Sequence, residues 1–108
     1  MDNRLLVMKW DYEYDKEGTW FDQDKGEERF DLKEGSAYPL PHISKKNVEV
    51  RAVTQEGDTV KAELYVDYRT VTVSDDGVPV VAHASNSYSV CGDSVSQSLV
   101  LTFTIEKP

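Results

Sequence analysis

The stretch from Val80 to Ile105 alternates apolar and polar side chains, and this alternation constrains the fold more than any other feature of the chain. A period of two is typical of a β-strand with one buried face. Gly92 and Asp93 stand midway and predict a two-residue turn with glycine first, so we expect a β-hairpin. The apolar face of this register pairs Val80 with Ile105, Ala82 with Phe103, Ala84 with Leu101 and Val90 with Val95. The wet face contains His83, Ser85, Ser87 and Ser89.

Other segments with alternating side chains predict further strands. They are expected at 5–14, 19–21, 29–33, 48–55, 59–68 and 71–73, with a charged loop at 22–28 that contains Gly26. The segment 36–47 holds Pro39 and Pro41, which cannot donate to a ladder. We therefore expect an extended crossover there, passing from one sheet to the other.

Glycine-containing turns connect these strands. A four-residue turn is predicted at 15–18, closed by a left-handed Gly18. The turn at 56–58 is expected to pair Val48 with Val66, Val50 with Leu64 and Ala52 with Ala62. Apolar positions are even up to Tyr68 and odd from Val71, which predicts a β-bulge near Arg69 and Thr70. A turn at Asp76 and Gly77 is expected to pair Val73 with Val80 and Val71 with Ala82.

Together these elements predict an all-β fold: an antiparallel β-sandwich or flattened barrel of seven to eight strands, mostly connected by hairpins. Both architectures fit the pattern. Residues 1–108 are expected to form a single domain in which the first strand can pair beside the last. Pro79 is expected at a sheet edge or next to a turn.

The charge balance restricts the kinds of partner. Twenty acidic residues against twelve basic ones give a net charge of -8, which disfavours direct nucleic-acid binding and binding to anionic membranes. The single cysteine, Cys91, cannot form an internal disulfide, so a cytoplasmic location is expected. No cofactor is predicted, and the pattern does not fix an oligomeric state.

Acidic residues are concentrated near the amino terminus. The first 34 residues hold eleven acids and six bases, and Asp22, Asp24, Glu27 and Glu28 lie together in the predicted loop. We predict that these four bind a basic protein partner, and that the chain is a non-catalytic interaction module. An inhibitor or immunity-type protein, whose carboxylates occupy a basic cleft, is one form of this function.

The alternative function is a carbohydrate or small-ligand binding module. Aromatic rings are also concentrated near the amino terminus, and Tyr14 and Trp20 are the candidates for an exposed platform that stacks on a sugar. Three polar residues, Asn86, Tyr88 and Gln97, interrupt the apolar face of the last hairpin. Either this end of the hairpin projects past the core into water, or the three line a small polar pocket. The predicted register makes Tyr88 and Gln97 direct neighbours.

The sequence carries no pattern typical of an enzyme or a metal site. His83 lies near Ser85 and Ser87 on a flat strand without a nucleophile elbow, so no hydrolase is expected. The run Glu13, Asp15, Glu17, Gly18 and Asp24 imitates the spacing of a calcium loop. Strands on both sides make a charged hairpin tip the better interpretation.

Overall fold

The structure is a computed structural model that describes residues 4–17 and 19–107. Its strands are β1 (Leu5–Lys16), β2 (Trp20–Asp31), β3 (Ala37–Pro39), β4 (Asn47–Glu56), β5 (Thr59–Val66), β6 (Arg69–Ser74), β7 (Val80–Val90) and β8 (Asp93–Glu106). No helix capable of crossing a membrane is formed by the described residues.

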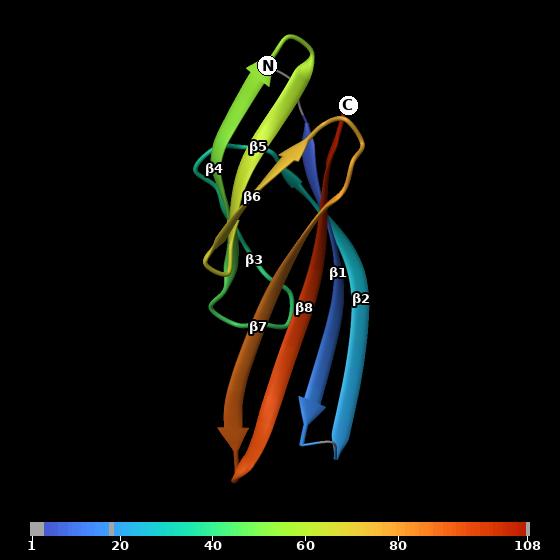
Figure 1. The fold of residues 1–108 in the computed structure, drawn as a ribbon, viewed down its shortest axis with the longest axis vertical. Coiled ribbons are helices and arrows are strands. Elements are labelled where there is room, and N and C mark those ends of the chain that lie inside the picture. Colours follow the sequence, from blue (N-terminus) through green and yellow to red (C-terminus); the bar gives the residue numbers. More distant parts are fainter. Residues whose placement is uncertain (1–3, 18, 108) are drawn as a thin grey trace.

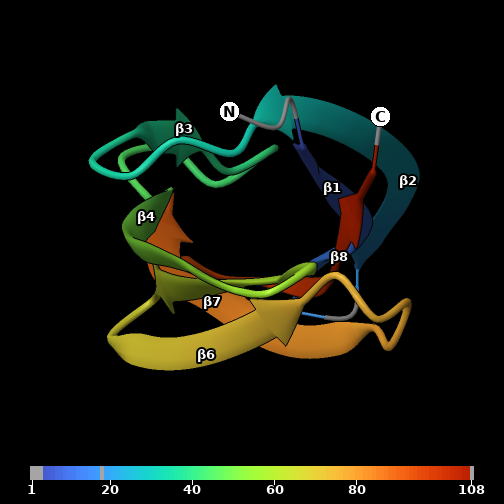
Figure 2. The ribbon, with the colours of Figure 1, turned by 90° about the horizontal axis from the view of Figure 1, so that it is seen from above.

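The eight strands form two antiparallel four-stranded sheets, and the described residues form no closed barrel (Figure 1). Sheet A has the order β2-β1-β8-β7, and sheet B has the order β3-β4-β5-β6. Seen down the long axis, β3 lies beside β2 on one side of the sandwich and β6 lies beside β7 on the other (Figure 2). The predicted all-β fold is therefore confirmed as a sandwich, with the first strand paired to the last.

The β7–β8 hairpin keeps its predicted faces, but its register is shifted by two residues. The turn is Cys91–Gly92 instead of Gly92–Asp93, and Val80 lies opposite Phe103. Both turn residues have positive φ, 51° and 86°, so glycine occupies the second position of the turn. Because a shift of two preserves parity, His83, Ser85 and Ser87 remain exposed as predicted.

The predicted loop at 22–28 is wrong, because β2 runs through it without interruption. β2 is an edge strand that is exposed on both faces over most of its length, so it needs no apolar alternation. Gly26 lies opposite Trp10, and a Cβ built on it would be 2.0 Å from the indole Cζ2. The glycine therefore lets the indole ring lie against the backbone of β2. The turn predicted at 15–18 begins too early, because Asp15 and Lys16 belong to β1 and lie opposite Phe21 and Trp20; the predicted left-handed Gly18 lies outside the described residues.

The second hairpin pairs Val48 with Val66 and Val50 with Leu64, as predicted. The register then shifts between Val50 and Ala52, so Ala62 lies opposite Val53 instead of Ala52. No bulge lies at Arg69 and Thr70. Instead, a two-residue turn at Asp67–Tyr68 separates β5 from β6, and this turn produces the change of parity.

The predicted hairpin between Val71–Val73 and Val80–Ala82 is also wrong. β6 pairs with β5 in sheet B, whereas β7 pairs with β8 in sheet A, so the turn at Asp76 and Gly77 belongs to a crossing between sheets. The first crossing occupies residues 32–36, so the crossover predicted at 36–47 is misplaced: most of that segment forms β3 and a loop within sheet B. Pro79 directly precedes the edge strand β7, as expected.

The core lies between the two sheets, and sheet A extends beyond it. Fully buried side chains include Leu6, Met8, Leu64, Leu101 and Phe103. The molecule measures 54 × 21 × 16 Å, and the ends of β1, β2, β7 and β8 continue past sheet B (Figure 1). We call residues 13–16, 20–23, 86–90 and 93–98 the distal end of sheet A. Both candidate surfaces described below adjoin it.

Candidate functional site

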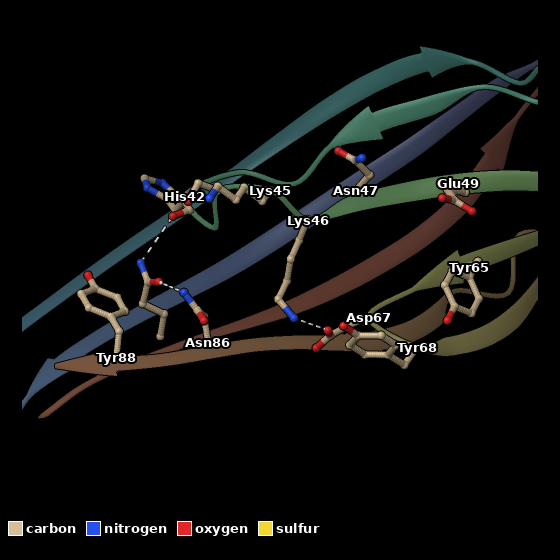
Figure 3. Close-up of a pocket in the computed structure, with 12 residues that line it drawn as sticks. His42, Lys45, Lys46, Asn47, Glu49, Tyr65, Asp67, Tyr68, Asn86 and Tyr88 are labelled. Carbon is tan, nitrogen blue, oxygen red and sulfur yellow. Dashed lines mark hydrogen bonds and ion pairs between the residues drawn. The ribbon is translucent and has the colours of Figure 1, made fainter.

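A cleft of about 760 Å³ opens where sheet A leaves the cover of sheet B. The loop 42–47, the turn Asp67–Tyr68 and the strands β7 and β8 line it (Figure 3). Asn86, Tyr88 and Gln97, the three residues that interrupt the apolar face, all contribute to its wall. This end of the hairpin thus projects past the core and also lines a cleft.

Hydrogen bonds fix the floor of the cleft. Gln97 is 9% exposed, and its Nε2 donates to the Tyr12 hydroxyl at 2.7 Å and to the His42 carbonyl at 3.4 Å. Its Oε1 accepts from Asn86 Nδ2 at 3.3 Å. Asn86 is the direct neighbour of Gln97, while Tyr88 lies opposite Val95, so the predicted pairing of Tyr88 with Gln97 is wrong. The amide of Gln97 is thereby held in one orientation.

His42 connects the cleft to strand β2. Its ring stacks on Tyr12 with centroids 4.2 Å apart, and its Nε2 lies 2.6 Å from Asp24 Oδ2. The hydrogen bond with His42 lowers the pKa of Asp24 below its ordinary value. The backbone of His42 has a φ of 65°, a left-handed conformation that is uncommon outside glycine. No sequence pattern indicated this arrangement, because it joins a loop to a strand 18 residues away.

The far wall of the cleft is the turn Asp67–Tyr68. Lys46 forms an ion pair with Asp67, and its Nζ lies 5.6 Å from the centroid of the Tyr68 ring. The second carboxylate oxygen of Asp67 accepts from the Ser85 backbone N–H at 3.1 Å. Asp67 therefore ties the end of sheet B to the edge strand of sheet A. Sequence reasoning missed these residues because they converge from separate loops.

The four predicted partner-binding acids all lie on β2, but they divide between its two faces. Asp22, Asp24 and Glu28 share one face, and Glu27 lies on the other. Glu27 pairs with Arg29 and with Lys9, and these contacts lower the pKa of Glu27. Asp24 is engaged by His42. The four therefore do not form one uniform patch.

Two exposed aromatic residues begin β2. Trp20 is 64% exposed and Phe21 is 59% exposed, and as neighbours in a strand they point to opposite faces. Tyr14, the other predicted platform residue, is half-buried on the inner face and lies opposite Asp22. Trp20 and Tyr14 do not line the cleft.

Comparisons with protein-family models, with curated proteins and with solved structures found no match to this chain. The site must therefore be interpreted from its own geometry.

The acidic residues whose spacing imitates a calcium loop do not lie on one face of the sheet. Glu13 and Asp15 lie on the outer face of β1, whereas Asp24 lies on the inner face of β2. Across residues 4–17 and 19–107, no group of three or more histidine, cysteine or acidic side chains is placed to hold a metal ion.

Proposed function

We propose that this protein is a non-catalytic interaction module that binds a basic protein partner through the edge strand β2. The observation that carries the proposal is the strand itself. β2 spans twelve residues at the edge of sheet A, and all of them except Gly26 and Phe30 are exposed. An edge of this length offers both backbone and side-chain contacts to a partner.

The backbone groups of β2 that point away from β1 belong to its odd-numbered residues. The Gln23 N–H donates to Asp22 Oδ1, and the Asp31 carbonyl accepts from the Tyr38 hydroxyl, so both groups point away from β1. Backbone groups in an edge strand alternate in direction, so those of Phe21 and Glu27 point the same way. An extended segment of a partner can pair with them by strand addition.

Charge favours a basic partner. The segment 5–31 contains nine acidic and four basic residues, which amounts to -5 of the net charge of -8. Such a field accelerates association with a positively charged surface. The exposed rings of Trp20 and Phe21 supply the large side chains on which binding energy is usually concentrated. Acidic side chains on an edge also prevent self-association, so the test must separate binding from this protective role.

Site-specific photo-crosslinking tests the proposal. A photoreactive residue at Gln23 is compared with one at Thr72, which is exposed on β6, the edge strand of sheet B. We expect a crosslinked protein that is specific to position 23 and carries a basic surface. The same products from both positions, or none from position 23, would contradict the proposal.

The charge dependence of association is then measured with the purified protein and its purified partner. The double variant Asp22→Asn, Glu28→Gln removes two charges from β2, and Glu56→Gln, Glu63→Gln removes two exposed charges from sheet B. We expect the first to slow association several-fold and to reduce its salt dependence, and the second to have little effect. Equal effects of the two variants would refute a specific role for β2.

A further inference from the structure

In the turn Asp67–Tyr68, the tyrosine is an unexpected residue because it adopts a left-handed backbone conformation. Both residues of the turn have positive φ, 46° and 68°. The other two-residue turns, Gly57–Asp58 and Cys91–Gly92, each include a glycine at a positive φ. A tyrosine is strained in this conformation. Since Tyr68 is 84% exposed, its ring gains little by burial, and stability does not explain its presence.

The ring of Tyr68 is nevertheless held at the cleft by Lys46, whose amine also pairs with Asp67. Tyr88, which is 41% exposed, lies at the other end of the cleft on β7 (Figure 3). Two accessible aromatic rings therefore line the cleft: Tyr68 at the end of sheet B and Tyr88 on β7 of sheet A. Flat rings present the surface on which the C–H face of a sugar packs.

Between the two rings lie polar groups with free hydrogen-bonding capacity. Asn86 uses Nδ2 to donate to Gln97, and no described residue donates to its Oδ1. Because Gln97 is itself fixed by Tyr12 and His42, the side chain of Asn86 is pre-oriented. Its Oδ1 and its second N–H can bind ligand hydroxyls without further ordering.

The charges around the cleft nearly cancel. Lys46 and Asp67 neutralise each other, and the other two charged lining residues, Lys45 and Glu49, are of opposite sign, with Glu49 also paired to Arg51. A balanced lining gives no preference for an anion or a cation. A volume of about 760 Å³ lies within the range of roughly 300–1,000 Å³ that is usual for small-molecule sites.

From these observations we infer that the cleft is a binding site for a neutral carbohydrate. The sugar rings pack on Tyr88 and Tyr68, and their hydroxyls exchange hydrogen bonds with Asn86. This inference is independent of partner binding at β2, because neither Trp20 nor the predicted acidic residues line the cleft.

Titration followed by ¹H–¹⁵N NMR tests the site. Neutral oligomers of glucose, mannose and N-acetylglucosamine are used as separate probes up to millimolar concentration. We expect at least one to shift the side-chain amide signals of Asn86 and Gln97 and the backbone signals of Tyr68 and Tyr88. Tyr88→Ala is expected to weaken binding by about tenfold, because truncation of an aromatic anchor has effects of this size.

Matched variants keep the result specific. Tyr88→Phe retains the ring and should bind nearly as well as the wild type, and Trp20→Ala should leave sugar binding unchanged while it weakens binding to a partner at β2. The inference is overturned if no neutral oligomer shifts these signals, if the shifts cluster around Trp20, or if only anionic oligosaccharides bind. Retained affinity in a folded Tyr88→Ala variant would also overturn it.

Discussion

The covered part of sheet A and its distal end are built from the same four strands, yet their inner faces differ. Under sheet B, the inner face of β8 carries Leu99, Leu101 and Phe103, all buried. Beyond sheet B, the inner face keeps a buried Val95 but also carries Gln97 on β8 and Asn86 and Tyr88 on β7. The strand period continues unchanged, while most of the inward side chains become polar. The difference in length between the sheets therefore determines where this sandwich presents polar groups.

The largest effect on the free energy of unfolding is expected from truncating a buried side chain in the covered part of sheet A, compared with an exposed one at the distal end. Leu101→Ala should reduce the free energy of unfolding by about 2–5 kcal/mol, because it leaves a cavity in the core between the sheets. Val90→Ala, at the distal end and 38% exposed, should change it by less than about 0.5 kcal/mol. Urea unfolding monitored by circular dichroism measures both. Similar losses in the two variants would show that the distal end contributes to the core as much as the covered part.

Trp10 and Gly26 lie side by side within the covered part, level with Leu101. Gly26→Ala should destabilise the protein by roughly 1–3 kcal/mol, because the new methyl group overlaps the indole ring. In a Trp10→Ala background the same substitution should have little effect. A double-mutant cycle from chemical unfolding measures this coupling. If Gly26→Ala is equally harmful in both backgrounds, the ring contact is not the cause.

A smaller loss of stability is expected from substitutions among the polar side chains at the floor of the cleft. Gln97→Leu should destabilise the protein by about 1–2 kcal/mol, because the Tyr12 hydroxyl and Asn86 each lose a hydrogen-bond partner. Asn86→Ala, at a less buried position, should cost less. Thermal unfolding of the two variants provides the comparison. A Gln97→Leu variant more stable than the wild type would mean that the polar floor is kept for binding and not for stability.

The sequence predicted which side chains face the core better than it predicted how the strands connect, for physical reasons. Alternation sorts residues into faces, and the two-residue error in the last hairpin left the faces intact because it preserved parity. β2 was missed between 22 and 28 because an edge strand with two wet faces needs no alternation. An Asp-Gly turn looks the same within a sheet and between sheets, so Asp76 and Gly77 gave no sign of the crossing.

The candidate site was predictable only where it interrupted a pattern. Asn86, Tyr88 and Gln97 could be singled out because they are polar at positions where an apolar residue was expected. His42, Lys46 and Tyr68 interrupt no pattern, since they lie in loops where polar residues are ordinary. Their roles depend on contacts between segments that are distant in sequence, and only the folded chain brings these together.

The smallest effect concerns pH and the contact between His42 and Asp24. The hydrogen bond with His42 lowers the pKa of Asp24, so this pair stabilises the folded protein at a pH above the ordinary pKa of an aspartate and loses that contribution as the pH falls through the lowered pKa. Both side chains are partly exposed, at 38% and 49%, so water screens the pair and the global stability should change little. We expect a local response instead: acidification should loosen the stacking of His42 on Tyr12, seen as a shift of the His42 ring signals in NMR spectra. In Asp24→Asn this acid transition should disappear. A transition that persists in Asp24→Asn would assign it to another carboxylate and would separate the loop 42–47 from strand β2.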